Sequence, residues 1–237
     1  MIWEKFKDQF HESWHKKMQP FIESEECDKI YKFLKKESGR GKTIVPLSSN
    51  VFRCFKETSY DDLKVVIMGF SPYHTMRNGI IVADGLLMSC SETGYLQPSL
   101  AQFYQAVETE LYNGLKLDID KNPDLKYLAK QGVLLFNASL TTELNKAGSH
   151  LELWEPFIKY VFDHVINTSM VPVVFLGKEA IKYEKYTAPF SWIFKVSHPA
   201  SAAYNNSDWD SEGVFKGINK ILKDTNNETI KWLTINK

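Results

Sequence analysis

Four short apolar segments, each rich in β-branched or aromatic residues, constrain the fold of this chain more than any other feature of its sequence. They are residues 64–68 (KVVIM), 132–136 (GVLLF), 171–176 (VPVVFL) and 192–196 (WIFKV). Segments of this length and composition are typical of strands that are buried on both faces of a sheet. Patterns typical of helices lie between or after them, at residues 98–115, 124–131, 152–167 and 213–223. The alternation predicts a parallel sheet with right-handed crossover connections.

The chain shows no boundary that would divide it into two domains. Its 237 residues are 43% hydrophobic, which is enough to build one large core. No internal repeat or Pro/Gly-rich linker interrupts the sequence, and the loosely polar residues 205–212 form too short a stretch to separate domains. We therefore expect residues 1–237 to fold as a single α/β domain.

Charge and cysteine content exclude several classes of protein. The 29 Lys and Arg residues balance 29 Asp and Glu residues, so a contact with a polyanion must come from a local patch. The three cysteines show no spacing typical of a disulfide framework or a zinc site. No apolar segment reaches the roughly 18 residues of a membrane helix, and the N-terminus is too polar for a signal peptide. These features favour an intracellular protein, in the cytoplasm or nucleus, over a secreted or membrane protein.

Polar side chains follow each of the four predicted strands. The segments are 69–74 (GFSPYH), 137–141 (NASLT), 177–179 (GKE) and 197–201 (SHPAS). In sheets of this class, ligands bind beyond the carboxyl ends of the strands. We therefore expect the four segments to converge on one cleft.

Nine segments match the motifs of one enzyme family in order and spacing. They are 69–74 (GFSPYH), 83–89 (ADGLLMS), 97–100 (QPSL), 131–137 (QGVLLFN), 140–141 (LT), 149–150 (SH), 154–155 (WE), 174–177 (VFLG) and 198–199 (HP). Together they resemble the family-1 uracil-DNA glycosylases over nearly the whole chain. The resemblance implies a three-layer α/β/α sandwich around a four-stranded parallel sheet, and a monomer without metal or organic cofactor. It also implies base excision repair, in which uracil is flipped out of single- or double-stranded DNA and excised.

The resemblance implies roles for individual residues. Asn137 would bind the edge of the base through its side-chain amide, and Tyr73 would exclude the methyl group of thymine. His198 would donate a hydrogen bond to the oxygen that gains negative charge as uracil leaves. Taken alone, Asn137 could equally cap a loop, His198 could be structural, and Tyr73 could serve only packing.

Residues near the same edge of the sheet are candidate DNA contacts. Short hydroxyl side chains suited to phosphate binding are Ser99, Ser149 and Ser201. Ser99 would equally serve as a helix N-cap. Positive charge would come from Lys178, Lys195 and Arg77, although solvated surface residues are the commoner explanation for such side chains.

The first motif departs from the family where the chemistry is concentrated. Ser71 replaces an Asp that stabilises the sugar cation and orients the attacking water. A hydroxyl can position water but supplies no negative charge, whose loss would slow the reaction about a thousandfold. We therefore expect reduced uracil excision, unless Asp84, which stands where the family has His, supplies the charge. Asp84 could equally be an ordinary turn residue.

Further departures alter the base pocket and the DNA contact. Phe70 replaces the Gln of the first motif, and Met88 replaces the Phe on which uracil stacks. Ala202 stands where the family places the Leu that fills the gap left by the flipped base, so Tyr204 or Trp209 would have to take that role. Residues 75–82 form a segment about four residues longer than its family counterpart.

Four functional hypotheses follow from the sequence. The first is a diverged uracil-DNA glycosylase that retains Asn137 and His198, with Ser71 holding the water. The second is a catalytically inactive homologue that binds DNA or a protein partner through the same face. A glycosylase for another altered base and an unrelated nucleotide-binding α/β protein are the remaining alternatives.

Overall fold

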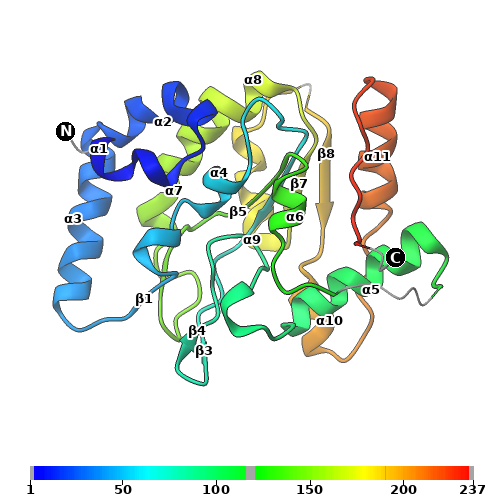
Figure 1. Cartoon of the computed structure of the whole chain (residues 1–237), viewed down its shortest axis with the longest axis horizontal. Coiled ribbons are helices and arrows are strands. Elements are labelled where there is room, and N and C mark those ends of the chain that lie inside the picture. Colours follow the sequence, from blue (N-terminus) through cyan, green and yellow to red (C-terminus); the bar gives the residue numbers. More distant parts are fainter. Residues whose placement is uncertain (1–2, 116–120, 190, 235–237) are drawn as a thin grey trace.

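The computed structural model describes residues 3–115, 121–189 and 191–234. At its centre is a four-stranded parallel sheet with the strand order β5-β2-β7-β8 (Figure 1). The strands are β2 (Val65–Gly69), β5 (Val133–Asn137), β7 (Val173–Leu176) and β8 (Ile193–Val196). Each strand coincides within two residues with one of the four apolar segments, so the predicted parallel sheet is confirmed.

Helices lie on both sides of the sheet and complete a three-layer α/β/α sandwich (Figure 1). Their bounds are α1 (Trp3–Phe6), α2 (His15–Ile22), α3 (Glu25–Gly39), α4 (Arg53–Glu57), α5 (Pro98–Tyr112), α6 (Lys126–Ala129), α7 (Leu151–Val161), α8 (Asn167–Ser169), α9 (Lys178–Ile181), α10 (Pro199–Tyr204) and α11 (Val214–Asp224). Helices α2, α3 and α7 pack together on one side, and α5, α10 and α11 on the other. No helix in the described part of the chain is long and apolar enough to cross a membrane.

Burial explains why these segments form strands. Every residue of β2, β5 and β7 is buried, as expected for strands covered on both faces. Aromatic residues fill the space between sheet and helices; Phe55 lies against Trp14 and Phe157, with ring centroids 5.1 and 5.6 Å apart. Each such side chain contributes about 1.5–3 kcal/mol by leaving water.

The helices differ from their predicted bounds in ways that local chemistry explains. The segment predicted at 98–115 ends as helix α5 at Tyr112, because Asn113 adopts a left-handed conformation with φ of 54° and caps the helix. The segment predicted at 152–167 comprises α7, a π-helical turn (Phe162–Ile166) and α8.

Two small antiparallel sheets were not predicted. One pairs β1 (Ile44–Val45) with β6 (Thr142–Glu143). The other pairs β3 (Met76–Arg77) with β4 (Ile80–Ile81), and this hairpin lies within residues 75–82.

The strand order creates one natural place for a ligand. After β2 the chain adds β5 on one side of it, and β7 and β8 then extend the sheet on the other side. The direction of strand addition therefore reverses between β2 and β7. In open parallel sheets the crevice at the carboxyl ends of such a pair is the usual binding site.

Candidate active site

A cavity of about 590 Å³ lies at this point of the sheet. Its walls come from residues after β2 (70–74), the end of β7 and the residues after it (176–179), the segment after β8 (197, 198, 200 and 201), and from Leu87, Met88, Ser99 and Ala147. Three of the four polar segments that follow the strands therefore line one cleft, as predicted. The prediction is wrong for the fourth segment, residues 137–141, which does not contribute to the walls.

A second groove, of about 660 Å³, lies between α3 and residues 42–48. It is mostly apolar, and no histidine or carboxylate is among the described residues that line it. The cavity at the sheet edge instead contains His74, Glu179 and His198. We therefore assign the candidate active site to the cavity at the sheet edge.

His198 is the second residue after β8 and immediately precedes helix α10. Its Nδ1 accepts a hydrogen bond from the backbone N–H of Ala200 at 3.1 Å, which caps the helix. Burial lowers the pKa of His198 to about 4. The ring is therefore neutral at pH 7, and since Nδ1 accepts, the proton resides on Nε2. His198 thus offers one N–H donor from the wall of the cavity.

Asn137 is the last residue of β5 and pairs in register with Gly69 of β2. Its side chain is 5% exposed, and its Oδ1 has no hydrogen-bond partner among the described residues. A Cβ at Gly69 would lie 2.9 Å from this oxygen and 2.3 Å from Leu87 Cδ1, so the three residues meet closely. Asn137 therefore lies just behind the cavity wall with an unused acceptor, which is costly unless a ligand satisfies it.

Tyr73 and Met88 form a connected part of the wall. The Tyr73 hydroxyl donates to the carbonyl oxygen of Met88 at 3.2 Å and shares a hydrogen bond of 2.6 Å with Ser99 Oγ. Burial raises the pKa of Tyr73, so this hydroxyl stays protonated. Ser99 is buried, and its hydroxyl forms its hydrogen bond with Tyr73.

Ser71, which lines the cavity, connects two loops. Its Oγ accepts from the backbone N–H of Gly148 at 3.2 Å. The neighbouring Phe70 packs its ring on Gly148, where a Cβ would lie only 2.4 Å from Phe70 Cζ. The two residues that replace the polar pair of the family motif therefore join the loop after β2 to the loop before α7.

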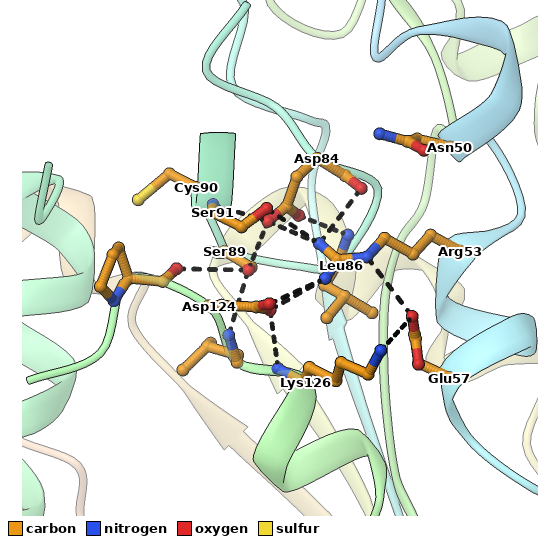
Figure 2. A network of polar contacts seen from close by, with 12 residues as sticks. Asn50, Arg53, Glu57, Asp84, Leu86, Ser89, Cys90, Ser91, Asp124 and Lys126 are labelled. Atoms are coloured by element: carbon orange, nitrogen blue, oxygen red, sulfur yellow. Dashed lines mark hydrogen bonds and ion pairs between the residues drawn. The ribbon is translucent and has the colours of Figure 1, made fainter. Parts of the chain in front are cut away.

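Asp84 does not supply the missing carboxylate. It is 0% exposed, does not line the cavity, and forms an ion pair of 2.7 Å with Arg53 (Figure 2). Among the described residues that line the cavity, Glu179 is the only acid, and Lys182 pairs with it at 2.6 Å. The hypothesis that Asp84 compensates for Ser71 is therefore wrong, because the buried Asp84 carboxylate already pairs with Arg53.

The candidate DNA contacts differ in accessibility. Ser201 is exposed at the cavity rim. Ser149 is also exposed, but its hydroxyl accepts from the backbone N–H of Glu143 at 2.8 Å. Ala202 is only 8% exposed, in helix α10, which packs on α5. A methyl group in that position presents almost no surface to a DNA strand.

The two aromatic residues after Ala202 have opposite environments. Tyr204, at the end of α10, is 89% exposed. Trp209 is 5% exposed and its indole N–H donates to the carbonyl oxygen of Ser197 at 2.9 Å. Only Tyr204 is free to reach a partner outside the fold.

Positive charge at the cavity is modest. Lys178 lines the cavity and is exposed. Lys195 pairs with Glu184 at 3.1 Å, and the Arg77 guanidinium lies 3.4 Å from the ring centroid of Tyr95. Of the three candidates, Lys178 is therefore the cation best placed beside the cavity.

Comparison with known proteins agrees with the fold and the motifs. Residues 55–223 match the model of the Uracil DNA glycosylase superfamily. The chain is 34% identical over 230 residues to a uracil-DNA glycosylase of Acinetobacter baumannii (strain AYE), an alignment that covers 95% of this chain and 93% of that protein. The chain belongs to the uracil-DNA glycosylase superfamily.

Further relatives and a solved structure support this assignment. A uracil-DNA glycosylase of Alkaliphilus oremlandii (strain OhILAs) is 33% identical over 232 residues, which cover 96% of this chain and 98% of that protein. The crystal structure of mimivirus uracil-DNA glycosylase superposes with a TM-score of 0.84 at 23% identity, covering 95% of this chain and 88% of that chain. At this identity, the likeness shows that the two proteins share a fold.

Sequence reasoning about this superfamily member missed Leu87 and Arg53. Leu87 occupies a variable position within the motif ADGLLMS, so no motif pointed to it, yet it lines the cavity beside Gly69. Arg53 lies 31 positions before its partner Asp84, and only the fold brings the two together. The pattern of apolar residues in the sequence predicts strands and helices, but it does not predict either of these contacts.

Proposed function

We propose that this protein hydrolyses the N-glycosidic bond of uracil, or of a related altered base, that is flipped out of DNA during base excision repair. It would act as a monomer. The observation that carries this proposal is the neutral His198, whose Nε2–H is a preformed donor at the cavity wall. Such a donor stabilises the negative charge that develops on the base as the bond breaks.

The other residues in the cavity wall, and Asn137 just behind it, suit recognition of a pyrimidine. Asn137 supplies a buried amide with an unpartnered oxygen, which can pair with the edge of a base. Tyr73, held by Met88 and Ser99, would exclude the methyl group of thymine. Met88 would cover the face of the ring. Phe70 would add an aromatic surface at the rim.

The proposed reaction is slow because Ser71 carries no charge. Its hydroxyl would position the attacking water, while the sugar cation would lack an opposing carboxylate. Ser201 and Lys178 would contact phosphates. Ser99 and Ser149 would add further hydroxyl contacts, although both hydroxyls already form hydrogen bonds within the protein.

A second candidate function is that of an inactive homologue that binds DNA or a protein partner through the same face. The observation that favours it is the absence of an unpaired carboxylate among the described residues lining the cavity. Activity measurements separate the two candidates directly.

The decisive experiment is single-turnover excision of uracil from a defined single-stranded oligonucleotide, with thymine at the same position as the control. We expect measurable excision of uracil, none of thymine, and loss of excision in Asn137→Ala because the base loses its edge contact. Retained DNA binding with no excision of any base would favour the inactive homologue. Excision of other altered bases but not of uracil would assign a different substrate.

We further propose that Tyr204 fills the gap that the flipped base leaves in the duplex. Stacking of a base on an aromatic ring contributes about 1–3 kcal/mol, so Tyr204→Ala should slow excision from double-stranded DNA by about tenfold. Excision from single-stranded DNA should change little, because no duplex gap has to be filled. Rate constants on the two substrates test this.

Tyr204→Phe is the matched control, since it keeps the ring and removes only the hydroxyl. It should behave as the unmodified protein on both substrates. An equal loss on single- and double-stranded DNA in Tyr204→Ala would show that Tyr204 does not act in the duplex gap.

A further inference from the structure

A partly buried cluster of charges lies next to the loop that contributes Leu87 and Met88 to the candidate active site. Arg53 of helix α4 pairs with Asp84 at 2.7 Å and with Asp124 at 2.9 Å (Figure 2). None of the three residues lines the cavity. Glu57 joins the cluster through Arg53 Nε at 3.9 Å and through Lys126 at 3.1 Å (Figure 2). These charges do not reach the cavity, so we ask which part of the chain they hold in place.

Asp84 binds both ends of the loop formed by residues 85–91, here called the Met88 loop. Its Oδ1 accepts from the backbone N–H of Leu86 at 3.1 Å. Its Oδ2 accepts from Ser89 Oγ at 2.6 Å and from the backbone N–H of Ser91 at 2.9 Å (Figure 2). Arg53 approaches the same Oδ2. One carboxylate therefore closes the loop and is itself fixed by a guanidinium.

The Met88 loop carries two walls of the cavity. Leu87 and Met88 both line it. Met88 has a φ of 60°, a conformation that a residue with a side chain adopts only where its surroundings impose it. Its carbonyl oxygen accepts from Tyr73, whose ring forms the neighbouring wall. The shape of the base pocket thus depends on bonds that hold this loop in an unfavourable conformation.

We infer that Asp84, held by Arg53, is a positioning residue that sets Leu87 and Met88 as the walls of the base pocket and thereby determines the preference for uracil-containing DNA. This inference rests on the proposed function. An amide at position 84 cannot replace the carboxylate, because both carboxylate oxygens accept hydrogen bonds and an amide has one accepting atom. Its NH₂ group would face another donor.

The test compares Asp84→Asn with the unmodified protein in binding. The probe is a single-stranded oligonucleotide with one 2′-fluoro-2′-deoxyuridine, whose fluorine disfavours the sugar cation and so keeps the base attached. The reference strand has thymidine at that position, and fluorescence anisotropy gives both dissociation constants. We expect the preference for the uracil strand to fall on the order of tenfold in Asp84→Asn.

Glu57→Gln is the matched control, because it removes a charge from the same cluster without touching the Met88 loop. It should leave the preference unchanged. If Asp84→Asn does not fold, Ser89→Ala removes one of the bonds from Asp84 to the loop and should lower the preference in the same direction. Folded variants of both positions with an unchanged preference would overturn the inference.

Amide hydrogen exchange adds a readout that does not depend on a ligand. The N–H groups of Leu86 and Ser91 donate to Asp84, so they should exchange faster in Asp84→Asn while those of β2 stay protected. A lower melting temperature without faster exchange in the loop would indicate a purely structural role and contradict positioning. If the unmodified protein itself shows no preference for the uracil strand, the proposed function fails. If, in addition, the Met88 loop exchanges at the same rate in Asp84→Asn and in the unmodified protein, the positioning role is overturned as well.

Discussion

Ser71→Asp should raise the single-turnover rate constant of uracil excision about a thousandfold. The reason is electrostatic, since a carboxylate about 4 Å from the sugar cation, at an effective dielectric near 20, stabilises it by roughly 4 kcal/mol. Because about 1.4 kcal/mol corresponds to a factor of ten in rate, this interaction corresponds to the expected thousandfold increase. The unmodified protein offers only a hydroxyl at this position.

The structure indicates that an Asp at position 71 can be accommodated. Ser71 Oγ accepts from the N–H of Gly148 at 3.2 Å, and a carboxylate oxygen can accept the same hydrogen bond. The packing of Phe70 on Gly148 would continue to hold the two loops together. The second carboxylate oxygen would then be available to the cavity.

Two controls make this prediction specific to charge. Ser71→Asn introduces a side chain of nearly the size of Asp but without its charge, so it should not raise the rate constant of excision. Glu179→Gln tests the acid at the cavity rim and should change the rate little, because Lys182 pairs with it. Equal rates for Ser71→Asp and Ser71→Asn would show that the missing negative charge is not the limiting defect.

His198→Ala should lower excision by about a hundred- to a thousandfold, the effect typical of losing one donor to a developing oxyanion. The neutral ring has its proton on Nε2 because Nδ1 accepts from Ala200. The matched control is His164→Ala, since His164 is exposed on the π-helical turn and does not line the cavity. If both variants lose activity equally, His198 has no special role.

The lowered pKa of His198 also makes a pH prediction. Burial reduces it to about 4 in the folded protein, below the value near 6.5 in an unfolded chain. The unfolded state therefore binds the proton more readily, and this contribution to stability is present above pH 6.5 and lost as pH falls towards 4. Its full size is on the order of 3 kcal/mol at most. The free energy of unfolding should decline less over this range in His198→Gln, as denaturant titrations would show.

The double variant Ser71→Asp, His198→Ala links the two predictions. If both residues act on the same transition state, the gain from the carboxylate should shrink when the donor is missing. A full thousandfold gain in the absence of His198 would show that the two groups act independently.

The sequence by itself determined the sheet and the position of the polar segments. Segments such as KVVIM and GVLLF have no polar residue in their interiors, so they can only be buried strands or short buried helices, and their length and branching favour strands. Once the strands are parallel, Asn137 at the end of β5 and His198 just after β8 must lie at the same edge of the sheet. Some of the motifs that indicate the superfamily, such as 69–74 and 198–199, lie at or just after the ends of these strands.

Only the tertiary structure decided which side chains face the cavity. Asp84 and Glu179 are both acids near the motifs, yet Asp84 is turned away because Arg53, 31 positions earlier in the chain, pairs with it inside the fold. Tyr204 and Trp209 are equally aromatic, but a carbonyl of Ser197 holds Trp209 in the core. Which side chains are buried depends on the partners that packing brings next to them. A charged group or an N–H is buried without a large cost only where a hydrogen-bond or ion-pair partner lies beside it.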